Sequence, residues 1–434
     1  MLVADTLRNM RIAILNSYDM RGGAARAAYR LHSGLRALGQ ENFMVVQSKS
    51  GDDADVLGPG NAVSRKLASL RPAMDLLPVL PYWSRKQGVF YPGWLPGGCL
   101  ARVAALRPDV VHMHWISGGL LYLPALRKLR VPVAWTLHDM WAFTGGCHYD
   151  NECGKHQRLC GSCPVLGSTH SFDLSYRGWK RKESAYRDTP LTFISPSNWL
   201  KDVARSSALL AHSTIHVIPN GIDTSIYRPI SKSLARERLG LPAKGKLILF
   251  GAANAAKDVR KGMEYLEKAI RVVSGAWLGC EIAAAIFGVA PSDAMPELGM
   301  KIYYPGILKD EGRLAELYSA ADVFVAPSLQ ENLSNTVMEA LSCGTPCVAF
   351  DVGGMRDMVE HEGNGYLARP RDADDLAAGI RWVLEDEERV RALCVRAREK
   401  VVSQFDAKVI ARRHVSLYEE ILESVGAKTQ TVDA

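Results

Sequence analysis

The feature that most constrains the fold is an alternation of short apolar runs with amphipathic segments along the 434-residue chain. Residues 10–16 form an apolar run that is followed by a helix-like segment over residues 27–38. The apolar pattern returns at residues 109–115 and 131–137. Short, fully apolar strands separated by helices predict parallel pairing, because the helices of βαβ crossovers cover both faces of the sheet. The fold class is therefore predicted to be α/β.

A second series of the same kind follows a linker. Its apolar runs include residues 246–251, 282–288 and 323–327. Before it, residues 219–238 have the turn residues and charges that are typical of a linker. We predict two Rossmann-like, doubly wound domains with parallel sheets that face a central cleft. They are expected over residues 10–222 and 229–404, with a last amphipathic helix over 405–428.

Composition excludes several classes of protein. Hydrophobic residues make up 47% and charged residues 23%, which is the average of soluble globular proteins. Neither a membrane-spanning run nor an export signal is recognisable, since Asp5 and Arg8 interrupt the N-terminal segment, so a cytoplasmic location is expected. The net charge of +7 is not gathered into basic runs, which fits an anionic ligand better than nucleic acid.

The cysteines divide into two groups. Nine cysteines without an export signal argue against a disulfide framework. Five of them lie in apolar surroundings and are expected to be small core residues: Cys99, Cys280, Cys343, Cys347 and Cys394. The other four share one Gly-rich loop over residues 145–168: Cys147, Cys153, Cys160 and Cys163.

The loop cysteines favour a structural zinc site. Four thiolates, two of them in a Cys-x-x-Cys turn, suit a closed tetrahedral site, with His148 and His156 as spare ligands. The spacing is looser than that of a zinc ribbon, so four unmetallated thiols are the alternative. A zinc-dependent nucleic-acid-binding module is a second alternative. It would need basic patches interleaved with aromatic residues, and the aromatic residues cluster over residues 75–94 instead.

The strongest chemical signal lies over residues 326–341, where a strand ends and a helix begins near Asn335. Amides at a helix N-terminus are unpaired, and the helix dipole favours an anion there. These residues therefore predict a diphosphate cradle: Asn332, Leu333, Ser334 and Asn335. Glu331 lies in the loop, and Glu339 lies about one turn inside the helix, where a carboxylate can accept hydrogen bonds from a ribose diol.

The chain resembles the retaining GT-B glycosyltransferases of family 4. The resemblance is carried by residues 317–328, the pair Glu331 and Glu339, the segments 343–354 and 363–367, and the linker at 219–223. The run at 135–141 with the cysteine loop is similar to a subgroup that includes colanic-acid and other exopolysaccharide glycosyltransferases. The resemblance implies that Glu331 contacts the donor sugar, that Glu339 contacts the nucleotide ribose, and that the last helix packs back on the first domain.

The family also places a basic pair after the first strand of its second domain, where it neutralises the donor diphosphate. Lys261 matches the lysine of this pair, but Gly251 is followed by alanines in place of the family's arginine. Arg260 or Lys257 is expected to take its place. A cation beside the departing diphosphate would stabilise the charge that develops in the transition state, and the family uses no catalytic metal.

In the first domain, Gly22 and Gly23 follow the first strand and match the family's Gly-Gly-Ala loop, where backbone amides can approach a phosphate or the acceptor. His138 follows the strand at 131–137 and resembles the family's active-site histidine; a purely structural core histidine is the alternative. His112 and His114 are expected to face opposite sides of the sheet, so that at most one of them reaches the cleft.

The resemblance implies a hexosyltransferase that takes a UDP- or GDP-sugar and acts with retention in the biosynthesis of surface polysaccharide. The expected acceptor is a glycan or an oligosaccharide linked to undecaprenyl diphosphate. A sugar-nucleotide epimerase or a phosphorylase on the same fold is the alternative. For the aromatic residues Trp83, Tyr91 and Trp94, a packed loop is the preferred interpretation, and peripheral contact with the inner membrane is the alternative.

Overall fold

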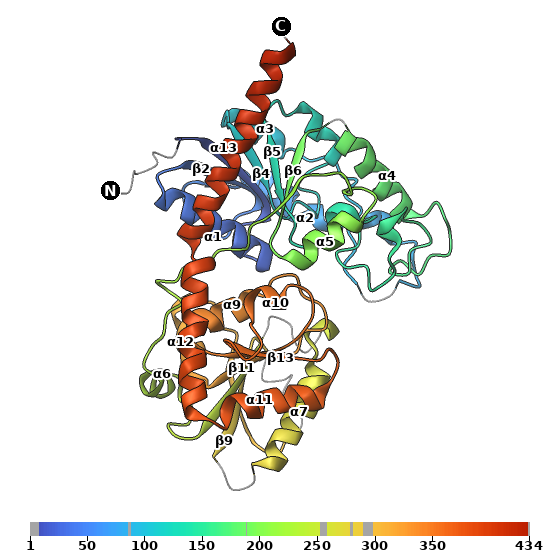
Figure 1. Cartoon of the computed structure of the whole chain (residues 1–434). Helices are drawn as coiled ribbons and strands as arrows, with labels where there is room; N and C mark the ends of the chain where they lie inside the picture. Colours follow the sequence, from blue (N-terminus) through green and yellow to red (C-terminus); the bar gives the residue numbers. More distant parts are fainter. Residues whose placement is uncertain are drawn as a thin grey trace. The chain divides into compact units, whose positions relative to one another are not determined.

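The computed structural model describes residues 8–85, 88–187, 189–251, 258–277, 281–289 and 298–432 (Figure 1). It divides the chain into two compact units. Unit 1 comprises Met1–Gly221 together with Ala407–Ala434, and unit 2 comprises Ile222–Asp406. Among the described residues, no helix combines the length and the apolar composition that are needed to cross a membrane.

Unit 1 is built on a seven-stranded parallel sheet with the order β3-β2-β1-β4-β5-β6-β7. Its strands are β1 Arg11–Tyr18, β2 Glu41–Ser48, β3 Val56–Leu57, β4 Val110–Met113, β5 Val133–Thr136, β6 Leu191–Ser195 and β7 Ile215–Val217. Strand β1 pairs in parallel with both β2 and β4, so the chain winds outward from the middle in two directions. The four residues of β4 and the four of β5 are all buried, as expected for strands covered on both faces.

The helices of unit 1 are α1 Gly23–Ala37, α2 Ala62–Asp75, α3 Cys99–Ala105, α4 Leu174–Arg187 and α5 Asn198–Ser206. The last helix, α13 Ala407–Val432, belongs to the same unit and shares a core with β1 and α1. A Cβ atom at Gly34 of α1 would lie only 2.7 Å from the carbonyl oxygen of Ala407. The absence of a side chain at Gly34 therefore allows the two helix backbones to approach closely.

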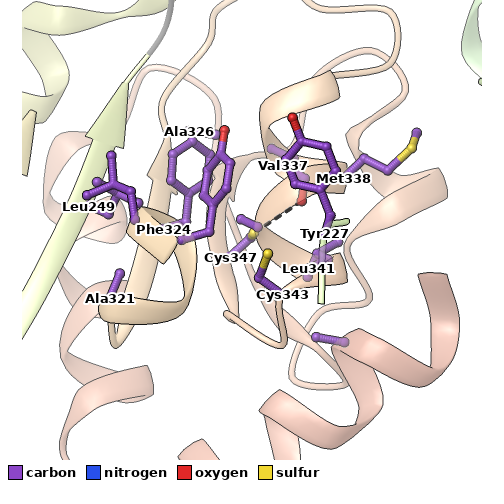
Figure 2. Close-up of a cluster of buried hydrophobic side chains, with 14 of the residues drawn as sticks. Tyr227, Leu249, Ala321, Phe324, Ala326, Val337, Met338, Leu341, Cys343 and Cys347 are labelled. Carbon is purple, nitrogen blue, oxygen red and sulfur yellow. Dashed lines mark hydrogen bonds between the residues drawn. The ribbon is translucent and has the colours of Figure 1, made fainter. Parts of the chain in front are cut away.

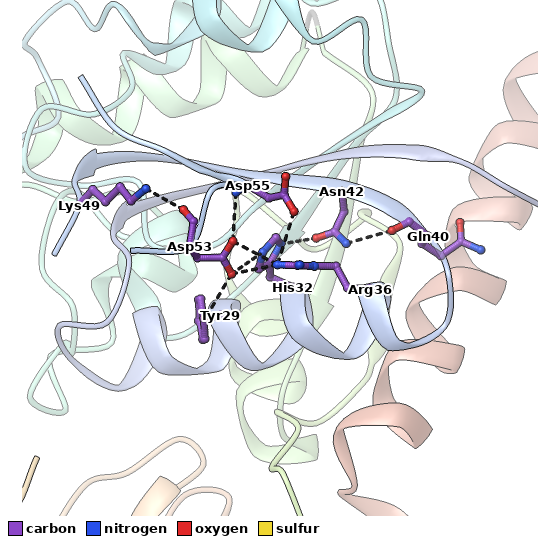
Figure 3. Close-up of polar contacts among 8 residues, drawn as sticks. All are labelled: Tyr29, His32, Arg36, Gln40, Asn42, Lys49, Asp53 and Asp55. Atoms are coloured by element: carbon purple, nitrogen blue, oxygen red, sulfur yellow. Dashed lines mark hydrogen bonds and ion pairs between the residues drawn. The ribbon is translucent and has the colours of Figure 1, made fainter. Parts of the chain in front are cut away.

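Polar contacts join helix α1 to the segment between β2 and β3 (Figure 3). The Asp53 carboxylate accepts hydrogen bonds from Arg36 Nη1 at 3.0 and 3.1 Å and from the Tyr29 hydroxyl at 3.2 Å. The buried His32 ring bonds the side chain of Asn42 on β2. Burial lowers the pKa of His32, so this ring is neutral at pH 7.

Unit 2 is built on a six-stranded parallel sheet with the order β10-β9-β8-β11-β12-β13. Its strands are β8 Lys246–Gly251, β9 Ile282–Phe287, β10 Lys301–Gly306, β11 Val323–Ala326, β12 Cys347–Phe350 and β13 Gly365–Ala368. Its helices are α6 Lys232–Leu239, α7 Met263–Ala276, α8 Glu311–Ala320, α9 Asn335–Ser342, α10 Met355–Met358, α11 Ala373–Leu384 and α12 Glu387–Gln404. The predicted α/β fold with two Rossmann-like parallel-sheet domains is confirmed.

Helix α9 is held against strand β11 by a dense apolar core (Figure 2). Val337, Met338 and Leu341 of the helix are fully buried in it together with Phe324 of the strand. Burying a side chain of this size contributes about 1.5–3 kcal/mol, so the position of the helix start is firmly determined. The loop that connects β11 to α9 is thereby fixed at both ends.

Two local features differ from what the sequence pattern indicates. The pattern of residues 120–129 is typical of a helix, but the structure has the 3-10 helix η2 Leu123–Lys128, with hydrogen bonds such as Leu129 N to Leu126 O that span three residues. Pro124 lies in its first turn and lacks an N–H donor. The Pro, Gly and aromatic residues of 75–99 favour an irregular segment, and helix α2 directly before it was not predicted.

Candidate functional site

The strand orders place a binding position in each unit. In unit 2 the chain winds away in opposite directions from β8 and β11, which are neighbours paired in parallel with Phe250 opposite Val325. Loops that leave such a pair of strands at their carboxyl ends diverge and open a crevice, where open α/β sheets bind their ligands. In unit 1 the corresponding strands are β1 and β4.

In unit 2 the loops after these two strands bring Lys261 and Glu331 together. The Nζ atom of Lys261 donates to Oε2 of Glu331 at 2.6 Å. Lys261 ends the 3-10 helix η5 Val259–Lys261, and Glu331 precedes helix α9. Both side chains are about one-fifth exposed, at 24% and 16%, so the charges are partly shielded from water but can be reached by a ligand. An ammonium and a carboxylate side by side can hold a phosphate and a sugar hydroxyl.

Two glycines allow the backbone to form this pair. Gly262 has φ +68°, and a Cβ there would lie 1.9 Å from the carbonyl oxygen of Pro327. Gly353 has φ +56°, and a Cβ there would lie 1.7 Å from the carbonyl oxygen of Glu331. Only glycine fits at either place, because both the left-handed backbone and the close approach exclude a side chain. Neither glycine was identified from the sequence as important for the site.

Arg260 lies beside Lys261 but is engaged by a near neighbour. Its Nε and Nη2 atoms donate to the two carboxylate oxygens of Asp258 at 3.0 and 2.8 Å. Burial raises the pKa of Asp258, but the hydrogen bonds from Arg260 outweigh it and lower the pKa overall. The carbonyl oxygen of Arg260 accepts from Leu329 N at 2.7 Å, which ties the two loops together. Lys257, the other candidate cation, falls outside the described residues.

The helix start at residue 335 is confirmed, and Ser334 is its N-cap, accepting a hydrogen bond from the backbone N–H of Val337. Asn332 and Leu333, which lie in the loop before this helix, are buried. Among the predicted donor-binding residues, Gly251 has a packing role as well, since a Cβ there would lie 2.2 Å from the Phe287 ring.

Glu339 is almost completely buried, with 1% of its surface exposed. Its Oε2 accepts a hydrogen bond of 2.9 Å from the Tyr318 hydroxyl. Burial and the neighbouring carboxylate raise the pKa of Tyr318 well above its usual value, so the phenol stays protonated and continues to donate. Tyr318 was not recognised as a site residue from the sequence, although it lies within the segment that carries the family resemblance.

In unit 1 the last part of β1 and the loop after β4 are joined by hydrogen bonds. Oδ1 of Asn16 accepts from Trp115 N at 2.8 Å, and Ser17 Oγ donates to the Ser117 carbonyl oxygen at 2.6 Å. Gly22 has φ +92° and precedes helix α1, which begins at Gly23. Both glycines are exposed, so the predicted Gly-rich helix start lies at the carboxyl end of β1.

His138 belongs to a stack of histidines in unit 1. Its Nε2 lies 2.9 Å from Nδ1 of His114, and the rings of His114 and His112 lie 4.3 Å apart between centroids. The expectation that His112 and His114 face opposite sides is wrong, because residues two apart on a strand share a face. His112 continues the network to the Tyr418 hydroxyl at 2.7 Å, and the His414 ring lies 5.4 Å from its own.

All four rings are expected to be neutral at pH 7. Burial lowers the pKa of His138 to about 4 and that of His414 to about 4, and it lowers the pKa values of His112 and His114 as well. Neighbouring histidines add to the shift for the last two. In the unfolded chain the same groups would bind protons near pH 6.5. Their depressed pKa values therefore give stability above pH 6.5 that is lost as the pH falls toward 4.

We expect the free energy of unfolding of unit 1 to fall between pH 7.5 and 5.5, by about 1 kcal/mol for each histidine that stays neutral. Urea unfolding followed by tryptophan fluorescence measures this change, since seven of the nine tryptophans lie in unit 1. His414→Phe is expected to reduce the pH dependence. The exposed control His212→Asn should leave it unchanged, and an equal dependence in all three proteins would contradict the assignment.

Another pair was missed from the sequence. The Asp139 carboxylate caps the 3-10 helix η3 Met140–Phe143 and lies 2.6 Å from Nδ1 of His148. His148, a predicted spare zinc ligand, is therefore engaged by a carboxylate, and His156 likewise lies 3.1 Å from Asp150.

The cysteine loop folds as a small buried layer. Cys147 and Cys163 share an apolar cluster with Phe90 and Leu166, and Cys160 is buried as well. Burial raises the pKa of all four thiols, and the nearby cysteines add to the shift for Cys147, Cys160 and Cys163, so the four groups are neutral thiols at pH 7. In the part of the chain that the structure describes, no three His, Cys, Asp or Glu side chains are arranged to hold a metal ion.

A buried lysine lies beneath this loop. Lys182 of α4 donates to the carbonyl oxygens of Trp141 and Thr144, the latter at 2.9 Å, and its Nζ lies 3.9 Å from the Trp141 ring centre. Burial lowers the pKa of Lys182 to about 7.

Comparison with solved structures identifies the fold. The chain matches sucrose-phosphate synthase from Thermosynechococcus elongatus with a TM-score of 0.68 and 20% identity, over 96% of this chain and 100% of that one. It matches Anabaena HepE in complex with UDP and glucose with a TM-score of 0.64 and 18% identity, over 95% and 100% of the two chains. Two Rossmann-like units in this arrangement along the chain define the GT-B fold of glycosyltransferases.

Sequence comparison identifies the family. Residues 21–226 match the family described as Glycosyltransferase Family 4, and residues 245–386 match Glycosyl transferases group 1. The D-inositol 3-phosphate glycosyltransferase of Xylanimonas cellulosilytica is 31% identical over 308 residues, which cover 67% of each chain. That of Thermobispora bispora is 28% identical over 74% of this chain and 72% of its own length. The chain belongs to glycosyltransferase family 4, and it is a glycosyltransferase.

Proposed function

We propose that the protein transfers a hexose from a UDP- or GDP-sugar to a glycan or to an oligosaccharide linked to undecaprenyl diphosphate. The observation that carries the donor assignment is the pair of Lys261 and Glu331 at the carboxyl ends of β8 and β11. The nearby start of α9 supplies backbone amides from Asn332 to Asn335, where an anion is favoured. The UDP and glucose bound to Anabaena HepE are consistent with such a donor.

Each side chain has a separate task in this proposal. The Lys261 ammonium shares its charge between the Glu331 carboxylate and the donor diphosphate, and Arg260 adds positive charge beside it. The Glu331 carboxylate accepts hydrogen bonds from hydroxyls of the sugar. Glu339, whose carboxylate accepts a hydrogen bond from the Tyr318 hydroxyl, is proposed to contact the ribose of the nucleotide. Charge that develops on the departing diphosphate is stabilised by groups already in position, without a catalytic metal.

The proposed transfer proceeds with retention at the anomeric carbon. The bond between this carbon and the diphosphate oxygen breaks, and a bond to the acceptor hydroxyl oxygen forms on the same face. The hydroxyl proton passes to the departing phosphate oxygen, so the products are the glycosylated acceptor and the nucleoside diphosphate. In unit 1, His138 and the amides at Gly22 and Gly23 are proposed to position the sugar and the phosphate.

For the acceptor, we propose an intermediate of surface-polysaccharide biosynthesis, which the protein would glycosylate in the cytoplasm. This proposal is supported by the resemblance of residues 135–141 and of the cysteine loop to exopolysaccharide glycosyltransferases. The curated relatives named above are D-inositol 3-phosphate glycosyltransferases, so an inositol phosphate is a necessary comparison substrate.

The experiment is a thermal-shift screen of the full chain with UDP- and GDP-hexoses, followed by product analysis. One nucleotide sugar is expected to raise the unfolding temperature, and nucleoside diphosphate should accumulate only when an acceptor is present. Proton NMR of the product then gives the anomeric configuration. Conversion of the donor without an acceptor would indicate an epimerase. If none of the nucleotide sugars raised the unfolding temperature, the donor assignment would be contradicted.

Structural zinc in the cysteine loop is a separate proposal. The backbone N–H groups of Val165 and Leu166 act to lower the pKa of Cys163, and that of Lys155 acts to lower the pKa of Cys153, although burial raises both overall. Such donors also stabilise a metal-bound thiolate. The sulfur atoms would have to move closer together to form a ligand set. Metal analysis of protein purified without added zinc distinguishes a zinc site from free thiols. Less than about 0.1 equivalent of zinc per chain would show that the thiols are unmetallated.

A further inference from the structure

Helix α2 of unit 1 turns an apolar face toward solvent. Within its 14 residues only Ala68 and Asp75 are buried. The large apolar side chains along the helix and the turns that follow it are instead exposed, from 39% for Met74 to 91% for Trp83. We call this set the α2 stripe: Val63, Leu67, Leu70, Met74, Leu77, Leu80 and Trp83.

The spacing of the stripe is that of one helix face. Val63, Leu67, Leu70 and Met74 follow one another at intervals of four, three and four residues, which places them on one side of an α-helix. Leu77 begins the 3-10 helix η1 Leu77–Val79, and Leu80 follows it three residues later. Because a 3-10 helix repeats every three residues, the row continues past the end of α2.

The charges around the stripe have one sign. Within residues 61–85, the basic residues Arg65, Lys66 and Arg85 are exposed. The single acidic residue of this segment, Asp75, is buried and accepts hydrogen bonds from the backbone N–H groups of Gly93 and Trp94. Among the described residues, neither Arg65 nor Lys66 forms an ion pair with a carboxylate. Lys66, three residues after Val63 and four before Leu70, borders the row, and Arg85 lies two residues after Trp83, whereas Arg65 lies on the opposite side of the helix. The exposed charges of the segment are positive, and its one acidic residue is buried.

The sequence predicted that Trp83, Tyr91 and Trp94 all belong to a packed loop, but the structure separates Trp83 from the other two. Tyr91 packs edge-on against Trp115, and Trp94 Nε1 donates to the Asp75 carbonyl oxygen at 3.0 Å. These two belong to the packed loop that the sequence predicted. Trp83 lies at the end of the stripe and is almost fully exposed. An indole in this position suits the boundary between water and lipid tails.

We propose that the α2 stripe is a docking surface for an anionic lipid bilayer, with α2 lying in the plane of the membrane interface. An amphipathic helix with leucines on one side and Lys and Arg beside them inserts its apolar face among the acyl chains, while its cations meet acidic headgroups. The charge pattern favours this occupant over a second copy of the chain, because a second copy would bring the same positive charges to the contact.

Vesicle flotation of the full chain tests the proposal without donor or acceptor, so its outcome is independent of the proposed function. The protein is expected to float with phosphatidylcholine vesicles that contain phosphatidylglycerol, more weakly with pure phosphatidylcholine, and less at high salt. Leu67→Glu/Leu70→Glu should lower the partition coefficient by at least about tenfold. Lys66→Ser/Arg85→Ser should remove most of the preference for anionic lipid.

The matched control is Val395→Glu on α12 of unit 2, where an apolar side chain is 57% exposed outside the stripe. It should bind like the wild type. Brominated lipids should quench fluorescence in the wild type more than in Trp83→Phe. Equal flotation of the wild type and of Leu67→Glu/Leu70→Glu would overturn the proposal. So would a wild-type dimer that becomes a monomer in this variant, because the stripe would then be covered by a second copy.

Discussion

Replacing Lys261 by methionine is expected to lower kcat for sugar transfer by about 10²–10³-fold. Methionine keeps most of the length and apolar volume of the side chain but removes the charge. The ammonium lies 2.6 Å from Glu331 at the carboxyl end of the sheet, where the proposed diphosphate departs. A charge that acts mainly on the developing negative charge should affect kcat more than the affinity for the nucleotide. Steady-state kinetics with the identified donor measures both.

The control for this variant is Lys244→Met, an exposed lysine of unit 2 away from the loops of the site. It should retain wild-type kinetics. Because Lys261→Met leaves the half-buried Glu331 without its cation, the double variant Lys261→Met/Glu331→Gln should recover stability but not activity. Full activity of Lys261→Met would exclude the proposed role of the ammonium.

Gly353→Ala should abolish most of the activity and lower the free energy of unfolding of unit 2 by about 3 kcal/mol. The new Cβ would lie 1.7 Å from the Glu331 carbonyl oxygen, and φ at this position is +56°. The backbone at residue 331 must therefore shift, which moves the carboxylate away from Lys261. Kinetics, together with denaturant unfolding, separates the loss of geometry from the loss of folded protein.

Gly240→Ala is the matched comparison for this effect. Gly240 follows α6 in the same unit with φ +63°, and a Cβ there would meet nothing within 4 Å. This substitution carries the backbone penalty of about 1–2 kcal/mol alone and should leave activity intact. If Gly353→Ala proved no more harmful than Gly240→Ala, the glycine would not be fixing the Glu331 loop.

The parts of the site that depend on strand topology were predictable. Lys261 and Glu331 are 70 residues apart in sequence, yet they meet because each follows one of two neighbouring parallel strands, and the alternation of strands and helices predicts this order. Where a side chain has several possible partners, the sequence did not predict which of them it contacts. Nothing in the sequence pattern says that Asp258 holds Arg260 or that the rings of His114 and His138 stack.

The orientation of α2 could not be predicted from the sequence, for a different reason. Apolar periodicity indicates which face of a helix is hydrophobic, and the usual inference is that this face is buried. In α2 the buried positions are instead Ala68 and Asp75, and the leucine row is exposed. Only the three-dimensional structure separates an apolar face that is covered from one that is exposed.

The return of α13 to unit 1 also determines the order in which the newly synthesised chain can fold. Ile410, Val415 and Tyr418 lie in the same core as Ile12 and Ile14 of β1, although unit 2 is translated between them. Unit 2 is continuous in sequence and can fold while synthesis proceeds, but the part of the unit 1 core that includes β1 cannot be completed until α13 has been made. Strand β1 therefore reaches its final packing only after the whole of unit 2 has been synthesised.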